Sequence, residues 1–129
     1  VIRCCFVTSR QRRTSLVRDR SSDVCSSDLA YDGIDGTDFD RVVLDLPEPW
    51  RVVPHAAGSL HAGGIIVAYT PSITQVIRFR ESLDAHGFRF AETVEVLNRT
   101  WHVEGQAVRP DHRMVAHTAF LTHARLLGP

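Results

Sequence analysis

The chain has 129 residues, 43% hydrophobic and 23% charged, with 15 arginines, no lysine and 15 acidic residues. This composition is typical of one soluble globular domain with a real core, and it argues against a strongly basic nucleic-acid binder. No apolar run has the length of a membrane span and no segment has the layout of a signal peptide, so we expect a cytoplasmic protein without a membrane partner.

The composition changes near Leu29. Residues 1–29 hold all three cysteines and six arginines against three acidic residues, a net charge of +3. Residues 30–129 hold all seven histidines and nine arginines against twelve acidic residues, a net charge of −3. We therefore treat 1–29 and 30–129 as separate segments.

The segment 1–29 has neither helical nor strand periodicity, and Ser-Ser-Asp occurs in it twice. Residues 23–29 match one reading frame of a widely used short-read sequencing adapter. We predict a translated artefact or a disordered segment here, joined to a genuine coding fragment. A basic arm for nucleic acid and a transit-like extension are the alternatives. Cys4-Cys5 lacks the spacing of a zinc site, so the cysteines indicate neither metal nor redox chemistry.

The first elements after this segment are a strand, a helix and a strand. Phe39 to Leu44 is a continuous apolar strand, of the kind found in parallel sheets covered on both faces. Trp50 to Leu60 has near-helical apolar spacing, and Gly63-Gly64 is predicted to end this helix in a left-handed turn. Ile65 to Tyr69 is predicted to be a second buried strand.

A second helix and two more strands complete the pattern. Ser72 or Thr70 is predicted to cap a helix that ends at His86-Gly87. Phe90 to Trp101 and Met114 to Leu127 alternate as strands, the second partly buried on both faces. The order β-α-β-α-β-β indicates an α/β fold, parallel at first and closed by a hairpin. The strand 39–44 would be central in a complete sheet, so its outer edge is expected to be apolar and unpaired.

Asp45-Leu46-Pro47-Glu48-Pro49-Trp50 directly follows the strand 39–44. Ligands of open α/β sheets bind outside the carboxyl ends of the strands, so Asp45 lies where such sheets usually have their active site. Each proline fixes its own φ near about −65° and pushes the preceding residue out of the α region, which makes this turn rigid. The alternative for Asp45 is an acidic turn residue that caps the next helix.

Several short segments occur in an order that resembles a known family. They are Asp45 to Trp50, Gly63-Gly64, Ala68-Tyr69-Thr70-Pro71, Thr74-Gln75, Glu95, Arg99-Thr100-Trp101, Val108-Arg109-Pro110, His112-Arg113-Met114 and His117-Thr118-Ala119-Phe120-Leu121. Together they resemble the tRNA (adenine-58-N1) methyltransferase family over almost all of residues 37–126. The resemblance implies the C-terminal half of a seven-stranded Rossmann-like methyltransferase sheet, namely strands 4, 5, 6 and 7 with two helices. It also implies S-adenosylmethionine as cofactor, tRNA as partner and a homo-oligomer, a tetramer.

The chemistry of that family gives Asp45 a role. N1 of adenine is a poor nucleophile, and its methylation places a positive charge on the base. A carboxylate that accepts a hydrogen bond from the exocyclic amine activates N1 and stabilises the cation as it forms. Asp45 matches the active-site aspartate of the family, and Asp45 with Leu46 is our candidate for contact with the cofactor. Tyr69 is predicted to hold the base after it leaves its stack, or else to be an aromatic residue that covers the core.

Four further residues are candidates for substrate binding. Gln75 is predicted to hydrogen-bond the base or the methyl donor, with capping of its own helix as the alternative. Arg109, with Arg99 and Arg113, is predicted to meet tRNA phosphates. Trp50 and His117 complete the set, although packing of the turn is the favoured interpretation of Trp50 and a satisfied core histidine that of His117.

Two expected absences limit this interpretation. The eight glycines form no Gly-x-Gly-x-Gly, so the main half of the donor site is expected to be missing and this chain alone to be inactive. The histidines lack the companion ligands of a metal site, so no metal is expected. A non-catalytic tRNA-binding or assembly subunit and another class I methyltransferase, for instance one acting on protein isoaspartate, are the alternatives. Retention of Asp45 and Tyr69 argues against the first, because a subunit without catalysis needs no carboxylate at that strand end. The anionic Asp45 argues against the second, because it disfavours a carboxylate substrate.

Overall fold

The structure is a computed structural model that describes residues 5–8, 14–16, 27–34 and 36–127. Its helices are α1 (Ser27–Asp32), the 3-10 helix η1 (Pro49–Arg51), α2 (Val53–Ser59) and α3 (Ile73–Ala85). Its strands are β1 (Cys5–Thr8), β2 (Thr14–Leu16), β3 (Phe39–Leu44), β4 (Leu60–Thr70), β5 (Phe88–Glu95), β6 (Trp101–Glu104), β7 (Ala107–Pro110) and β8 (Phe120–Leu126).

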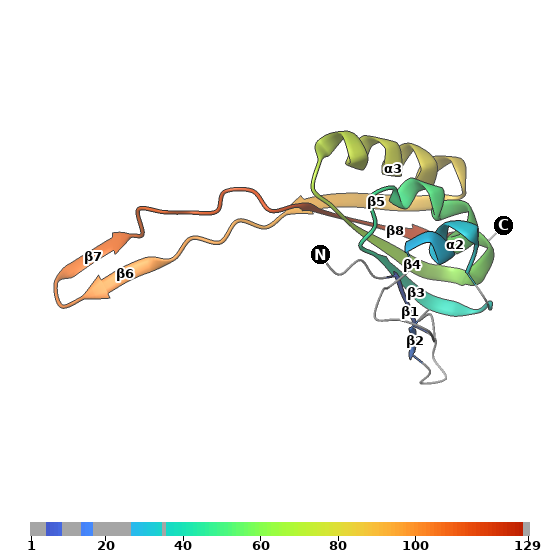
Figure 1. Cartoon of the computed structure of the whole chain (residues 1–129), viewed down its shortest axis with the longest axis horizontal. Helices are drawn as coiled ribbons and strands as arrows, with labels where there is room; N and C mark the ends of the chain where they lie inside the picture. The colour runs from blue at the N-terminus through green and yellow to red at the C-terminus, as the bar shows by residue number, and fades with distance from the viewer. Residues whose placement is uncertain (1–4, 9–13, 17–26, 35, 128–129) are drawn as a thin grey trace.

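The strands form one mixed sheet and one small ribbon. The large sheet has the order β2-β1-β3-β4-β8-β5, and β6 pairs with β7 alone. Only β3 and β4 run parallel among the described pairs; the others are antiparallel. Figure 1 shows α2 and α3 over one side of the sheet, with β6 and β7 at the tip of a long extension. We call this extension, residues 96–119, the arm.

The core lies between the parallel pair and the helices. Val42 is opposite Ile66 and Leu44 is opposite Ala68, and all four side chains are fully buried together with Phe79 of α3. Burying a side chain of the size of leucine or phenylalanine contributes about 1.5–3 kcal/mol, so these contacts dominate the packing. The parallel strands predicted from the two apolar runs are therefore confirmed.

The opposite face of the sheet is more open than the apolar runs predict. Val43, Tyr69 and Leu121 are 36%, 42% and 37% exposed. Successive side chains of a strand point to opposite faces, and the helices of this chain cover one face (Figure 1). The prediction that strand 39–44 is covered on both faces is wrong for that reason, and only one face of Phe120–Leu126 is well buried.

The sequence predicts α3 well but joins η1 and α2 into one helix. Ser72 caps α3 through a capping box with Gln75, which confirms the predicted start, and the helix ends at Ala85. The predicted helix 50–60 is instead interrupted at Val52. Pro54 has no N–H to donate to the carbonyl of Trp50, and that carbonyl accepts a hydrogen bond from Ser82 Oγ at 3.0 Å.

Gly63-Gly64 lies inside β4 and does not end the preceding helix. α2 passes into extended backbone at Leu60, and the register with β3 slips between Leu60 and Ile65. Gly63 has φ +88°, and a Cβ on Gly64 would lie 2.9 Å from the carbonyl oxygen of His61. The two glycines therefore form an irregularity that feeds the chain from α2 into the sheet.

The last two strands are shorter than predicted, and the β6-β7 hairpin was not predicted at all. Phe120 pairs with Thr70 of β4 and with Glu95 of β5 in the final rung of both ladders. Residues 96–100 and 111–119 have no partner strand among the residues that the structure describes, although their sequences alternate. A strand needs a hydrogen-bonded neighbour, so alternation alone overestimates these two elements.

The outer edge of β3 is paired. β1 runs antiparallel to β3 with Cys5 opposite Leu44 and Thr8 opposite Arg41, so the expected unpaired edge is wrong. The prediction that residues 1–29 are artefactual or disordered falls largely outside the described residues and stays a prediction. Within the described residues, no helix is long and apolar enough to cross a membrane.

Candidate active site

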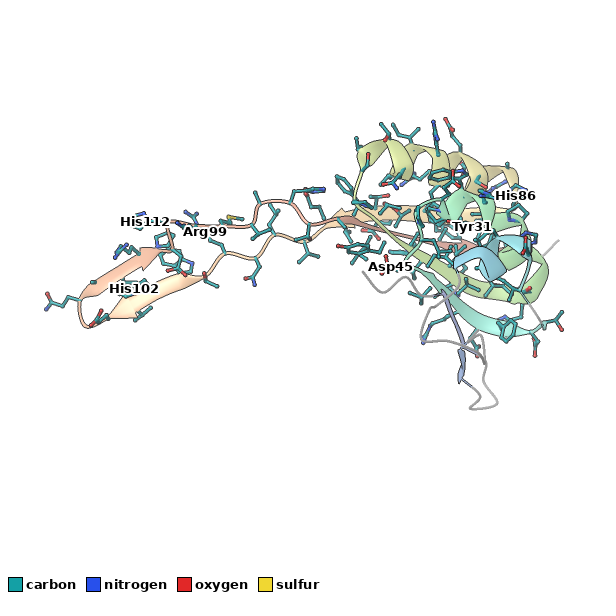
Figure 2. All side chains as sticks on the ribbon, viewed as in Figure 1. Tyr31, Asp45, His86, Arg99, His102 and His112 are labelled. Carbon is teal, nitrogen blue, oxygen red and sulfur yellow. The ribbon has the colours of Figure 1, made fainter. Side chains whose placement is uncertain are left out.

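Asp45 and Tyr69 lie at the same level at the carboxyl ends of two neighbouring parallel strands, Asp45 directly after β3 and Tyr69 one residue before the end of β4. Each directly follows one member of the register pair Leu44–Ala68. Leu44 and Ala68 point into the core, so the alternation of the strands turns Asp45 and Tyr69 toward the open face. Asp45 is half-buried and Tyr69 is exposed. Figure 2 shows Asp45 at the end of the body from which the arm leaves, and His86 at the other end.

The turn that carries Asp45 is held from two sides. Gln75 Nε2 of α3 donates a hydrogen bond of 2.8 Å to the carbonyl of Pro47. The N–H of Glu48 donates to the hydroxyl of Tyr31 at 3.1 Å. Main-chain groups of consecutive residues are thus hydrogen-bonded to a helix on one side and to α1 on the other. The carboxylate of Asp45 is attached to a turn that is rigid before a ligand arrives.

Tyr31 is a residue of the site region that the sequence analysis did not find. The guanidinium of Arg51 lies 4.4 Å from the centre of its ring, a cation–π contact. Nε2 of His55 lies 3.1 Å from the carbonyl oxygen of Tyr31. No sequence signal distinguishes this lone aromatic residue, because its partners lie 17 and more residues away. Its contacts join α1 to the beginning of α2.

Three predicted site residues build the turn. Leu46 is 3% exposed and its side chain belongs to the core, which leaves only its main chain to meet a ligand. The ring of Trp50 packs 5.4 Å from the guanidinium of Arg78 in α3, as expected for a residue that packs the turn. Both amide atoms of Gln75 are occupied, since Oε1 accepts from the N–H of Ser72 at 3.1 Å. The capping alternative for Gln75 is therefore confirmed.

The structure does not bring all candidates to Asp45. Arg109 lies in β7 on the arm, and Figure 2 shows Arg99, His102 and His112 on the arm as well, far from Asp45. His117 lies near the base of the arm, with its ring hydrogen-bonded to Glu95 and to the carbonyl of Pro71.

His117 is exposed and precedes β8, so the interpretation as a core histidine is wrong. Its hydrogen bonds to the carbonyl of Pro71 and to the carboxylate of Glu95 raise the pKa of His117. Glu95, like Tyr31, was not among the predicted site residues, although the resemblance did include it.

The arrangement at these strand ends is suited to a flat, hydrogen-bonding ligand. Asp45 offers a fixed acceptor and Tyr69 offers an exposed aromatic ring at the same level. The glycines of the described ranges lie before β3, in α2, early in β4, before β5 or on the arm, so none forms a turn at this edge. Within the same ranges, no three His, Cys, Asp or Glu side chains gather as metal ligands.

Comparisons with known proteins place the chain among methyltransferases. The family model of the tRNA methyltransferase complex GCD14 subunit matches residues 8–109. A tRNA (adenine(57)-N(1)/adenine(58)-N(1))-methyltransferase TrmI of Methanocaldococcus jannaschii is 43% identical over 94 residues, 72% of this chain and 33% of the relative. The chain spans about a third of the length of the curated relatives it matches.

Solved structures show the same fold. An SAM-dependent O-methyltransferase of Thermotoga maritima has a TM-score of 0.73 and 31% identity, over 77% of this chain and 37% of that one. The tRNA (m1A58) methyltransferase TrmI of Aquifex aeolicus has a TM-score of 0.69 and 32% identity, over 74% of this chain and 39% of that one. The predicted fold class, part of a Rossmann-like methyltransferase sheet, is confirmed. With a family model matching more than half of its length, the chain belongs to the family of the tRNA methyltransferase complex GCD14 subunit.

Proposed function

We propose that the protein is a tRNA (adenine-58-N1) methyltransferase, and that residues 30–129 form the C-terminal part of its catalytic domain. The observation that carries this proposal is the level placement of Asp45 and Tyr69 at the carboxyl ends of β3 and β4. This placement occurs in a chain whose relatives are named for methylation of N1 of adenine.

Asp45 acts on the acceptor base in the proposed reaction. Its carboxylate accepts a hydrogen bond from the exocyclic amine and so increases the electron density at N1. The same hydrogen bond strengthens as the base becomes cationic, so it stabilises the transition state more than the ground state. Because Gln75 and Tyr31 already hold the turn of Asp45, little reorganisation accompanies this step. Tyr69 stacks against the base once it has left the tRNA loop.

S-adenosylmethionine is the proposed cofactor, and when bound it supplies an electrophilic methyl group on a sulfonium centre. The residues of this chain fit the side of such a site that holds the acceptor base. The carboxylate of Asp45 and the main chain of Leu46 lie at the edge that faces the cofactor. A carboxylate substrate such as isoaspartate would meet the like charge of Asp45, which disfavours that alternative.

tRNA is the proposed partner, and Arg99, Arg109 and Arg113 are its proposed phosphate contacts. All three lie on the arm, which extends away from Asp45 (Figures 1 and 2). A folded tRNA is large enough to meet an arm while one of its bases enters a site on the body. The net charge of −3 over residues 30–129 means that phosphate contacts are confined to such local sites.

A homo-oligomer, a tetramer by family resemblance, is also proposed. The arm supports it through seven apolar side chains that are 41–70% exposed. They are Val96, Leu97, Trp101, Val103, Val108, Met114 and Val115. Exposed apolar surface of this extent on a thin extension is typical of a protein–protein contact.

The test is the variant Asp45→Asn, made in the protein translated from the complete reading frame of its gene. An unmodified tRNA transcript is incubated with S-adenosylmethionine, and 1-methyladenosine is quantified by mass spectrometry. We expect turnover to fall by about 10²–10³-fold, the usual cost of one preorganised electrostatic contact, with little change in tRNA affinity. Asp84→Asn in α3 is the matched control.

A transcript with guanosine at position 58 must not be methylated. Equal turnover of Asp45→Asn and the parent protein would remove Asp45 from the mechanism. If the parent protein binds tRNA but never methylates it, the non-catalytic subunit is the correct alternative.

A further inference from the structure

His117 lies at the base of the arm, where β4 and β5 end and β8 begins. Thr70, Phe120 and Glu95 form the last rung shared by β4, β8 and β5. The ring of His117 packs 4.9 Å from the ring of Phe120, just beyond this rung. Figure 1 shows β5 and β8 continuing from this point into the two sides of the arm. A contact made by His117 therefore acts on both the sheet and the arm.

The two ring nitrogens of His117 bind different segments. Nε2 lies 3.0 Å from the carbonyl oxygen of Pro71, two residues after Tyr69. Nδ1 is hydrogen-bonded to the carboxylate of Glu95, the last residue of β5. His117 itself belongs to the returning side of the arm. It therefore links the loop after Tyr69, the outgoing side of the arm and the returning side.

Both partners of the ring are acceptors. A carbonyl oxygen and a carboxylate cannot donate a hydrogen bond, whereas neutral imidazole has one N–H and one lone pair. Opposite a carbonyl oxygen and a carboxylate, only the imidazolium form donates at both nitrogens, so this geometry favours the charged ring. Of the segments that meet His117, β5 contributes the charged Glu95, and the other two contribute the uncharged Pro71 and Phe120.

We propose that His117, as an imidazolium, is a positioning residue that holds the loop after Tyr69 against the base of the arm. It touches no reacting atom, because both nitrogens are occupied by the protein. Its effect on catalysis rests on the proposed function, since Tyr69 must be in place when an arm-bound tRNA presents its base. The hydrogen-bonded link itself exists independently of that function.

The protonation state provides the first test. In the chain labelled with ¹⁵N-histidine, both ring nitrogens of His117 are expected to give N–H signals at neutral pH, and Glu95→Gln is expected to lower its titration midpoint. The raised pKa of His117 agrees with this expectation. A bare ring nitrogen in the parent chain at neutral pH would overturn the proposal. This measurement does not depend on any variant that alters the ring.

The second test measures the link by hydrogen exchange of the amides of Thr70, of residues 72–74 and of residues 96–98. His117→Gln is expected to speed their exchange roughly two- to fivefold, the scale of an exposed ion pair. His123→Gln is the matched control, because His123 also faces a glutamate, Glu92 at 3.3 Å, but reaches only from β8 to β5. His117→Arg, which keeps two donors, should retain protection and lose its dependence on pH. Equal exchange in the two glutamine variants would overturn the proposal.

Turnover distinguishes this proposal from the proposed function. His117→Gln should lower kcat for tRNA methylation more than it changes KM, and the parent rate should fall as pH rises through the pKa of His117. His117→Arg should restore kcat without this fall, an outcome that a packing role would not produce. Failure of the parent protein to methylate would contradict the proposed function alone, since the first two tests need no methyl transfer.

Discussion

Removing the side chain of Gln75 tests how the turn of Asp45 is held. In Gln75→Ala, the carbonyl of Pro47 loses a donor at 2.8 Å and the N–H of Ser72 loses an acceptor at 3.1 Å. Each half-buried hydrogen bond is worth about 1 kcal/mol, so we expect a loss of about 2 kcal/mol of unfolding free energy. In a domain of this size that corresponds to about 4–8 °C in Tm.

Two further variants separate the capping of α3 from the bond to Pro47. Ser72→Ala removes the acceptor for the N–H of Thr74, at 3.3 Å, and should cost about 1 kcal/mol. Gln75→Glu keeps the acceptor of the capping box but replaces the donor to Pro47 with a carboxylate oxygen. Gln75→Glu should therefore lower the unfolding free energy by at least about 1 kcal/mol.

Urea unfolding followed by circular dichroism measures the three losses, and hydrogen exchange at the amides of Glu48 and Trp50 locates them. Gln75→Ala and Gln75→Glu should speed exchange in the turn, whereas Ser72→Ala should leave it unchanged. Equal destabilisation by Gln75→Ala and Ser72→Ala, within about 0.3 kcal/mol, would refute the reasoning, because the bond to Pro47 would then contribute nothing measurable.

Three further predictions concern other parts of the molecule. Gly64→Ala should cost about 1–3 kcal/mol in urea unfolding because its Cβ meets the His61 carbonyl at 2.9 Å, whereas Gly58→Ala in open helical space should be neutral or stabilising. Hydrogen bonds to a main-chain carbonyl and to Asp40 raise the pKa of His61. The contribution of His61 to the unfolding free energy is therefore complete at pH values below its unfolded pKa and is lost as the pH rises through its folded pKa. Thermal melts across pH should show a smaller loss in Asp40→Asn, because the hydrogen bond to the carbonyl of Ala62 remains; an unchanged profile would contradict it. Trp101→Ser on the arm should shift sedimentation toward smaller species without lowering Tm, and unchanged sedimentation would exclude this residue from the oligomer contact.

Local signals in the sequence predicted β3 and α3 within a residue or two. The start of α3 depends on Ser72 and Gln75, three residues apart, and its apolar positions repeat at helical spacing. The same local signals misplaced Gly63-Gly64, because a glycine pair permits both a helix end and an irregular strand. The pairing of β4 with β3 decides between the two.

The placement of Asp45 beside Tyr69 also followed from the sequence. Two apolar strands in a β-α-β order run parallel, and residues at their carboxyl ends reach the same edge of the sheet. The motifs thus predicted which residues share the candidate site. They did not show that the side chain of Leu46 is in the core, or that Arg109 stands on an arm away from it.

The sequence by itself therefore determined the order of elements, the family and the two residues at the strand ends, because these depend on neighbours a few positions apart. Tertiary structure alone decided which groups hold them: Gln75 reaches Pro47 across 28 residues, and His117 reaches Pro71 across 46. Tertiary structure also ended β5 and β8 where their partners end, although the sequence continued to alternate. The physical reason is that a hydrogen bond forms with whichever acceptor the fold brings within reach. The number of residues between donor and acceptor in the sequence does not predict that partner.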